Sequence, residues 1–541
     1  MKRLALVPCA LGVSPLLAQP TPASRPDVPA TQLTFTDVTV QAGLDAWHAQ
    51  PTDPAPRAAH MLAGGAVGDF NNDGWQDFFF LAGGALPDKL FINNHDGTFT
   101  DRALEWNVNA KHIGAGALAA DFNDDGYLDI FVTSHGAPGT LGEIGKHRLY
   151  LNNGPDAQGQ FTFTDVAQIA GVNTTGTVIA DGFSAAAGDY DLDGDLDLAV
   201  AGWFQPIAGN TLFRNDGLNP DGVPIFTNVT NVLPADMLNT RGFAPSFVDT
   251  DGDWYPELLW VSDFSTSKYF VNNTDGTFSD QTAQAGVGLD QWGMGNTQGD
   301  FDADGRLDWY VTSIYDPDDL TDYNGNKLYM NLGDHTFIER ATQTNADDGG
   351  WGWGVVAVDL DHDADLDLAQ TNGWHNGDIF INDPSKVFLN DGSGVFHESA
   401  QLCQLEHTAQ GRGLARIDYD NDGDQDIIII SREGRLSLFR NNTEGPNANW
   451  IRVIIDTSAR KDLAPHGIGA RVRATTDTHN QLRYVDVAGH YLCNSEHTVH
   501  FGLARAQRVT IDLQWHDGTR LRLPDVPVNQ TITVRTPPIP K

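Results

Sequence analysis

Residues 188–197, GDYDLDGDLD, place five carboxylates close together with no lysine or arginine among them. Like charges at this density repel one another and oppose folding unless a cation neutralises them. Ca²⁺ prefers six to eight hard oxygen ligands, which a tightly curled loop with alternating carboxylates can supply. The stretch therefore predicts a calcium loop rather than a solvated acidic turn.

The same nine-residue pattern occurs seven times along the chain, and we number the copies loops 1 to 7. Positions 1, 3, 5 and 9 supply side-chain oxygens, position 7 supplies its backbone carbonyl, and position 6 is usually the glycine of a sharp turn. This pattern predicts up to seven Ca²⁺ ions. In chain order the predicted ligands are Asp69, Asn71, Asp73, Trp75 and Asp77; Asp121, Asn123, Asp125, Tyr127 and Asp129; Asp189, Asp191, Asp193, Asp195 and Asp197; Asp249, Asp251, Asp253, Tyr255 and Glu257; Asp300, Asp302, Asp304, Arg306 and Asp308; Asp359, Asp361, Asp363, Asp365 and Asp367; and Asp418, Asp420, Asp422, Asp424 and Asp426.

Two loops depart from the pattern at position 6, where they carry Trp254 and Ala364 instead of glycine. We expect these two sites, in loops 4 and 6, to be weaker or differently wound. A helix-loop-helix calcium hand would need a glutamate at position 12, and none of the seven loops has one. Apolar β-type runs such as DIFVTS follow the loops instead, so they connect strands.

Each loop lies in a unit of about 50–60 residues that contains four short strand patterns, which is typical of a propeller blade. Six units contain a fourth strand such as TFTD (162–165), whereas the seventh lacks one after its loop. The missing copy, TFTD, occurs at 34–37 and would close the ring. The sequence thus predicts an all-β fold: a seven-bladed β-propeller with calcium loops, closed by the N-terminal strand, plus a small C-terminal β-domain.

Small residues precede every loop by five positions, as expected where seven strands converge on an axis. They are Gly64, Gly116, Ser184, Ala244, Gly295, Gly354 and Gly413.

The predicted organisation is a signal peptide at 1–18, a linker at 19–33, the propeller at 34–445 and the β-domain at 446–541. The start of the chain is basic and then apolar, as in a secretory signal. An exported chain would permit a disulfide between Cys403 and Cys493, and the alternative is two separate buried thiols.

The loops with their glycine-rich strands resemble FG-GAP/VCBS repeats, the type found in integrin α-chain propellers. The tail at 450–515 resembles the ASPIC/UnbV module, particularly in GIGARV, GHYLCNSEHTVHFGL and DLQWHDG. Together they are similar to the cartilage acidic protein family over nearly the whole mature chain. The resemblance implies secreted, adhesive or matrix-associated binding.

Composition narrows the class of partner. The net charge of −39 argues against nucleic acid and anionic membranes, because no basic stripe is available to meet phosphates. The 27 Phe, 13 Trp and 12 Tyr are too many for a disordered acidic chain. No later segment has about 20 uninterrupted apolar residues, so we expect no membrane insertion and a location that is secreted, periplasmic or on the cell exterior.

The face opposite the loops collects the remaining unusual residues, either as a ligand site or as plugs of the axis. These residues are His112, Asp181, Arg241, Trp292, Trp351, Trp353 and Arg412. Aromatic rings beside Arg and Asp suit a glycan or a protein side chain. The sequence favours a calcium-binding extracellular adhesion or ligand-binding protein. The alternative is a secreted carbohydrate-active enzyme, such as a polysaccharide lyase that uses His112 or His60 with Arg241.

Overall fold

A computed structural model describes residues 33–50, 60–135, 146–174, 181–203, 209–375, 379–488 and 490–538. The predicted signal peptide and nearly all of the predicted linker lie outside these ranges. Residues Thr31–Lys541 form one compact unit. The described part is all-β apart from single turns of helix, and none of its helices has the length and apolar character needed to cross a bilayer.

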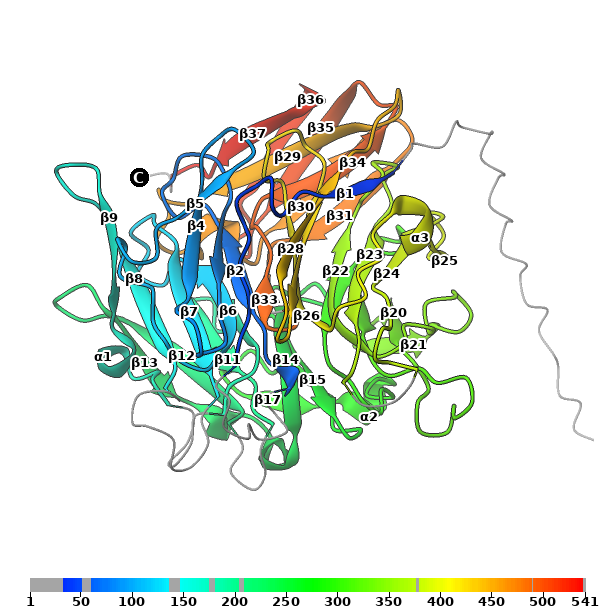
Figure 1. The fold of residues 1–541 in the computed structure, drawn as a ribbon, viewed down its shortest axis with the longest axis horizontal. Helices are drawn as coiled ribbons and strands as arrows, with labels where there is room; N and C mark the ends of the chain where they lie inside the picture. The colour runs from blue at the N-terminus through cyan, green and yellow to red at the C-terminus, as the bar shows by residue number, and fades with distance from the viewer. Residues whose placement is uncertain are drawn as a thin grey trace, which may run out of the picture. The chain divides into compact units, whose positions relative to one another are not determined.

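Seven antiparallel sheets follow one another along the chain, and we call them repeat sheets 1 to 7 (Figure 1). Each has four repeat strands in meander order, with one acidic loop between its first two strands. In order they comprise β2 (Gly65–Gly68), β3 (Asp77–Phe80), β4 (Lys89–Asn93) and β5 (Phe99–Asp101); β6 (Gly114–Ala120), β7 (Asp129–Ser134), β8 (Arg148–Pro155) and β9 (Phe161–Asp165); β10 (Ala185–Gly188), β11 (Asp197–Val200), β12 (Thr211–Leu218) and β13 (Pro224–Asn228); β14 (Arg241–Val248), β15 (Glu257–Asp263), β16 (Lys268–Asn272) and β17 (Phe278–Asp280); β18 (Asn296–Gly299), β19 (Asp308–Val311), β20 (Lys327–Gly333) and β21 (Thr336–Glu339); β22 (Gly352–Val358), β23 (Asp367–Asn372), β24 (Lys386–Asn390) and β25 (Phe396–Glu398); and β26 (Gly411–Ile417), β27 (Asp426–Ser431), β28 (Leu436–Asn441) and β1 (Phe35–Asp37).

The short helices mostly follow the fourth strands. They are α1 (Ala167–Ala170), α2 (Thr282–Ala285) and α3 (Ala400–Cys403), with 3-10 turns η2 (Thr230–Val232), η3 (Ala235–Asn239) and η4 (Pro465–Gly467).

The N-terminal strand completes the last repeat sheet, as its sequence predicts. In the antiparallel pair of β1 with β28, Phe35 faces Asn441 and Asp37 faces Phe439. The first strands of sheets 7 and 1, β26 and β2, also contact each other. These contacts are consistent with a propeller.

An asparagine at the third strand joins each repeat sheet to the one before it. Its side-chain amide donates to the carbonyl at position 8 of its own loop and to the carbonyl at position 2 of the preceding loop. Asn152, for example, donates to Leu128 at 3.3 Å and to Phe70 at 2.8 Å. In sheet 1, Asn93 donates to Tyr419 of loop 7. We call these the clasp asparagines: Asn93, Asn152, Asn215, Asn272, Asn331, Asn390 and Asn441.

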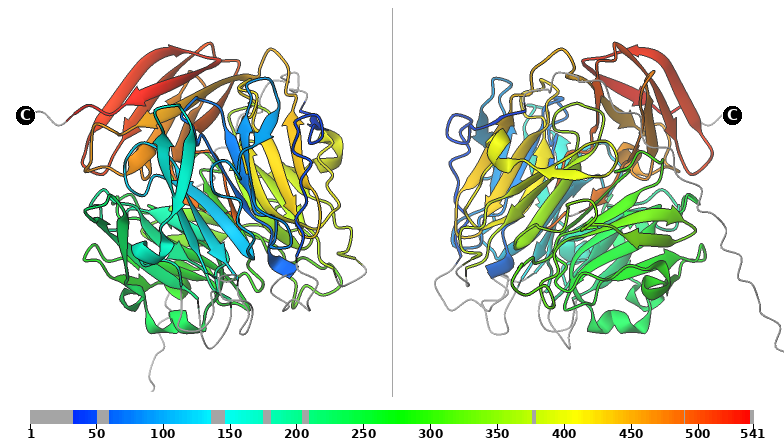
Figure 2. Two further views of the ribbon diagram at one scale, coloured as in Figure 1. Left: turned by 60° about the vertical axis from the view of Figure 1, so that its left-hand side comes forward. Right: turned by 90° about the vertical axis from the view of Figure 1, so that its right-hand side faces the viewer.

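The C-terminal residues form two further sheets, which we call the C-terminal module. One contains β29 (Asn449–Asp456), β34 (Val499–Ala504) and β37 (Gln530–Arg535). The other contains β30 (Arg471–Thr475), β31 (Asn480–Tyr484), β35 (Arg508–Gln514) and β36 (Arg520–Pro527). Two short strands, β32 (Val487–Ala488) and β33 (Cys493–Asn494), leave the module and pair with repeat sheets 3 and 1. Figure 2 shows the module in orange and red beside the repeat sheets.

The core of the module is continuous with that of the repeats. One buried cluster contains Phe131 and Leu198 from repeat sheets 2 and 3 together with Val453 and Phe501 from the module. The two predicted domains are thus successive in sequence but share apolar packing.

The predicted disulfide is absent from this structure, where Cys403 and Cys493 are both free and buried. Cys403 packs between sheets 6 and 7 against residues such as Leu405, whereas Cys493 packs with residues of sheets 1 and 7 such as Ile430. The strand that carries Cys493 is paired with β2, in a different cluster from Cys403, which agrees with the alternative of two separate buried thiols.

Candidate functional site

All seven acidic loops share one backbone hydrogen bond. The backbone N–H of position 6 donates to the position-1 carboxylate in every loop, as from Gly194 to Asp189 at 2.9 Å. Trp254 and Ala364 make this bond too, with φ of 82° and 86°. At this bond loops 4 and 6 match the others, because Trp254 and Ala364 accept a left-handed backbone, at a cost of about 1–3 kcal/mol each. Loop 4 differs at position 4, where the N–H of Gly252 also donates to Asp249, at 2.8 Å. Weaker binding at sites 4 and 6 stays a prediction.

Position 9 has a structural as well as an acidic role. It is the first residue of the second strand in every repeat sheet and is buried. In sheet 3, Asp197 accepts backbone N–H groups from Tyr190 at 3.1 Å and from Asn215 at 2.8 Å. The same carboxylate thus fixes the loop to the third strand, a pattern repeated at Asp77, Asp129, Asp308, Asp367 and Asp426.

The loops bring carboxylates together in the way that a cation site requires. Single oxygens from three residues lie within 4.8 Å of one another in the sets Asp189/Asp191/Asp197, Asp300/Asp302/Asp304 and Asp359/Asp361/Asp367. A set of the same kind in loop 4 is Asp249/Asp251/Asp253. The donors are all oxygen atoms, which suits a hard divalent cation.

Several of these oxygens are buried without a hydrogen-bond partner among the described residues. They are one oxygen each of Asn123, Asp191, Asp300, Asp359, Asp418 and Asp420. Burial, with neighbouring carboxylates adding to it, raises the pKa of Asp189 to about 8 and of Asp363 to about 9. A bound cation would give these buried oxygens a partner and neutralise their unfavourable charge. The residues therefore fit a cation site.

Basic residues of the C-terminal module reach several loops. Arg471 donates to Asp249 at 2.6 Å, and Arg452 lies 2.9 Å from Asp418. Lys461 donates to the carbonyl of Asp124 at 2.5 Å, and Arg473 donates to that of Gly305 at 3.3 Å. Three of these four contacts join residues more than 100 positions apart in the chain, so no local sequence pattern indicates them.

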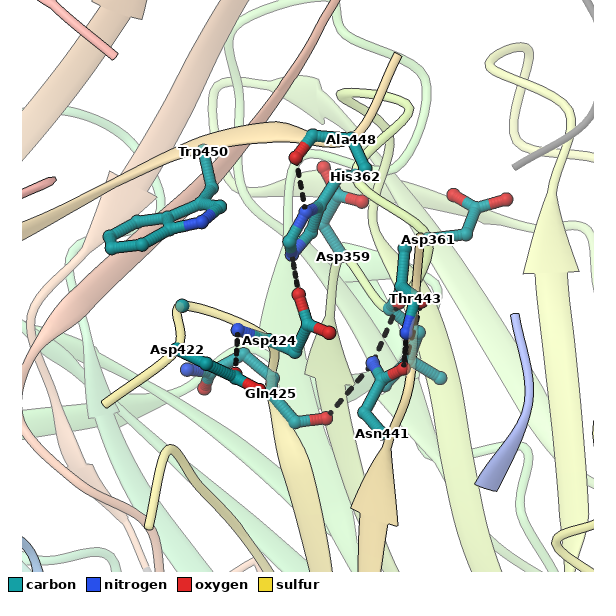
Figure 3. Close-up of polar contacts among 12 residues, drawn as sticks. Asp359, Asp361, His362, Asp422, Asp424, Gln425, Asn441, Thr443, Ala448 and Trp450 are labelled. Carbon is teal, nitrogen blue, oxygen red and sulfur yellow. Dashed lines mark hydrogen bonds and ion pairs between the residues drawn. The ribbon is translucent and has the colours of Figure 1, made fainter. Parts of the chain in front are cut away.

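Loops 6 and 7 also meet the start of the module (Figure 3). His362 in loop 6 has Nδ1 3.2 Å from the carbonyl oxygen of Ala448 and Nε2 3.6 Å from Asp424 of loop 7. Trp450 lies so close to Gly423 that a side chain there would collide with its ring. The module therefore covers this part of the loop-bearing end.

A second site lies at the opposite ends of the strands. A pocket of about 100 Å³ is lined mainly by rings, which come from repeat sheets 3 to 6. Its aromatic residues are Trp203, Phe243, Phe264, Trp292, Tyr323, Trp351, Trp353 and Trp374. We call it the aromatic pocket. Among the described residues, Met61, Met294, Ile314 and one carboxylate, Asp263, complete the lining.

Polar groups at the aromatic pocket are few and fixed. The indole N–H of Trp203 donates to Asp263 at 2.9 Å. The Arg241 guanidinium lies 5.0 Å from the ring centroids of both Trp203 and Phe264, within cation–π range. An aromatic pocket with one carboxylate and one guanidinium close by can stack on a ring-shaped ligand and hydrogen-bond to its edge.

Four of the seven residues predicted on this face meet at the aromatic pocket: Trp292, Trp351 and Trp353 line it and Arg241 adjoins it. His112, Asp181 and Arg412 are almost fully buried instead. His112 lies 3.0 Å from Asp88, and Arg412 stacks on Trp353 at 4.2 Å while donating to backbone carbonyls. A buried His112 cannot reach a polysaccharide, which weakens the lyase alternative; its His60 version stays a prediction.

Pocket residues that the sequence did not single out are Trp203, Phe264, Tyr323 and Trp374. Their positions just after second strands, or in the following connection, were the available signal.

Comparison with known proteins defines the class of this chain. The FG-GAP-like repeat family matches residues 69–132, 189–260, 249–311 and 320–369, and the ASPIC and UnbV family matches 461–540. The chain thus contains FG-GAP repeats followed by an ASPIC/UnbV domain.

Individual relatives agree. Cartilage acidic protein 1 from Homo sapiens and from Mus musculus is 30% identical over 266 residues, which is 46% of this chain and 37% or 38% of the relative. Integrin alpha-V from Gallus gallus is 29% identical over 223 residues, which is 36% of this chain and 19% of that protein. This chain is homologous to cartilage acidic protein 1 over about half its own length, and the matched segment spans well under half of each relative.

Proposed function

We propose that this chain is an extracellular ligand-binding protein in which bound cations hold a propeller together and the aromatic pocket binds the ligand. The observation that carries the proposal is the aromatic pocket, where five tryptophans converge at the end away from the acidic loops. The similarity to cartilage acidic protein 1 and to an integrin alpha chain supports the same class.

The scaffold we infer is a closed ring of seven blades, one for each repeat sheet. Three features support it: β1 supplies the fourth strand of sheet 7, β26 contacts β2, and the clasp asparagines run from sheet to sheet and return from sheet 1 to loop 7. A closed ring leaves no open sheet edge between the first and last repeats.

Calcium is the cation we infer, with up to seven ions. Carboxylate or amide oxygens at positions 1, 3, 5 and 9 and the carbonyl at position 7 would hold each ion, which would neutralise carboxylates that burial otherwise disfavours. Calorimetric titration of the chelator-stripped protein should give several binding events that saturate at no more than seven ions. A titration with no heat and no shift in stability would reject this part of the proposal.

The ligand we favour is a pyranose ring of an extracellular glycan. Tryptophan and tyrosine faces stack on the apolar face of such a ring, and Asp263 and Arg241 can meet its hydroxyl groups. The test is an array of glycans and matrix proteins probed with the intact protein in calcium. Binding to oligosaccharides supports the proposal, binding only to proteins would replace the glycan with a protein partner, and no binding would reject the site.

A further inference from the structure

Residues 487–488 and 490–494 of the C-terminal module form a segment that extends between the first strands of the repeat sheets. Val487 and Ala488 pair with Ala187 and Ala186 of β10, and Cys493 and Asn494 pair with Gly65 and Ala66 of β2. These short strands also contact β6, β14 and β26. Figure 1 shows β33 beside β26, away from the sheets of its own module.

Hydrogen bonds hold this segment to four repeat sheets. The carbonyl of Leu492 accepts the N–H groups of Gly65 and Ala117, both at 3.2 Å, and the N–H of Leu492 donates to Ser184 Oγ at 2.8 Å. The N–H of Asn296 donates to the carbonyl of His490 at 3.2 Å. These bonds fix the path of the segment.

The repeat sheets are shaped to receive it. A side chain at Gly64 or Gly116 would collide with the backbone of Leu492, and one at Gly295 would collide with the carbonyl of His490. These glycines belong to the set of small residues that precedes each loop by five positions. Their size therefore makes room for the segment as well as for neighbouring strands.

Tyr491, at the centre of this segment, lies directly behind the aromatic pocket. Its side chain is fully buried and its hydroxyl donates to the carbonyl of Met61 at 3.0 Å. Its ring centroid is 5.7 Å from that of Phe243 and 5.2 Å from that of Trp353, and both of these residues line the pocket. Tyr491 thus contacts three lining residues without lining the pocket itself.

We propose that Tyr491 is a positioning residue for the aromatic pocket, so that the C-terminal module forms part of the ligand site. This inference rests on the proposed function for its ligand, but the placement of Tyr491 can be tested without one. Deleting the ring would leave a space behind Phe243 and Trp353, because the surrounding side chains relax only partly into such a cavity. Phe243 and Trp353 would then lose the rigid ring that packs against them.

The experiment compares Tyr491→Ala, Tyr491→Phe and wild type in the full-length protein with calcium. The first measurement is acrylamide quenching of tryptophan emission, and the second is affinity for the oligosaccharide that binds wild type best in the array. Tyr310→Ala is the matched control, since Tyr310 is equally buried but packs between sheets 5 and 6, outside the pocket. Tyr491→Leu serves if the alanine variant does not fold.

We expect Tyr491→Ala to raise the quenching constant about twofold and to weaken oligosaccharide binding at least tenfold. Tyr491→Phe should restore both to wild-type values, and Tyr310→Ala should change neither. Unchanged quenching in a folded Tyr491→Ala or Tyr491→Leu variant would overturn the inference. If no oligosaccharide binds wild type, the proposed ligand is wrong, while the quenching result still decides the placement of Tyr491.

Discussion

The two ends of the repeat sheets carry different kinds of residue. The loop-bearing end concentrates carboxylates that repel one another, and the C-terminal module meets it with Arg452, Lys461, Arg471 and Arg473. The opposite end has one carboxylate among the residues that line its pocket, and the rest are apolar or aromatic. Charged residues are thus concentrated at the loop-bearing end, and aromatic residues are concentrated at the opposite end.

This difference predicts which substitutions should change stability and which should change binding. Position-9 carboxylates and clasp asparagines bond to backbone groups, so their replacement disturbs the fold directly. Trp292 and Trp351 are partly exposed at the pocket. Substitutions at the loop-bearing end should therefore mainly change stability, whereas substitutions at the aromatic pocket should mainly change binding.

Removing the cations should have the largest effect on stability. Each site at 100-fold excess over its Kd contributes about 2.7 kcal/mol to the free energy of unfolding. With several sites, EDTA should lower the melting temperature by about 10 °C or more, as measured by calorimetry. Excess Ca²⁺ should restore it, and matched sodium chloride is the control for ionic strength. An unchanged melting temperature would contradict the cation role of the loops.

Breaking one clasp should come next. Asn152→Ala removes three hydrogen bonds, two that the amide donates to the buried carbonyls of Phe70 and Leu128 and one that it accepts from the N–H of Gly154. The expected loss is about 2–4 kcal/mol in the free energy of unfolding, measured by urea denaturation. The exposed neighbour Asn153→Ala is the control and should cost under about 1 kcal/mol. Equal losses in the two variants would mean that the clasp has no special role.

A change at the aromatic pocket should affect binding and spare stability. Trp292→Ala should weaken ligand binding at least tenfold, which is about 1.4 kcal/mol, because it removes a stacking surface. Its melting temperature should stay close to that of wild type. Trp47→Ala is the control, because Trp47 is 55% exposed and is not a pocket residue. Equal losses of affinity in Trp292→Ala and Trp47→Ala would contradict a role of the pocket in binding.

The smallest expected effect concerns the winding of the loops. Ala364→Gly should stabilise the protein by about 1 kcal/mol, because glycine accepts the φ of 86° without strain. Gly126→Ala, at the same position of loop 2, should destabilise it by a similar amount, since Gly126 has a φ of 93°. Thermal unfolding in calcium measures both. Shifts of the same sign in the two variants would contradict equivalent winding.

The repeats were predictable because their signals are local. Alternating acids, a following apolar run and the displaced strand at 34–37 lie within short stretches of sequence, and each pattern implies one backbone path. The partial burial of the opposite face was not predictable in this way. His112 and Arg412 occupy strand starts like Trp292, and only packing between sheets decides which of them meets the pocket.

The sequence did not predict that residues of the C-terminal module insert between the first strands of the repeat sheets. Residues 487–488 and 493–494 pair with strands about 300 and 430 residues earlier, and no local pattern joins them. The same insertion separates Cys493 from Cys403, and both thiols are free. In hindsight, the small residues before each loop, Gly64 and Gly116 among them, were the available signal, since they leave space between the first strands.

The central claim is that the acidic end stabilises the protein and the aromatic end binds the ligand. One array measurement tests it directly, with Trp292→Ala and Asp191→Asn compared at saturating Ca²⁺ and at a temperature where both variants are folded. The account predicts that Trp292→Ala loses the wild-type binding signals and that Asp191→Asn keeps them. Loss of those signals in Asp191→Asn with retention in Trp292→Ala would contradict it and place recognition at the loops.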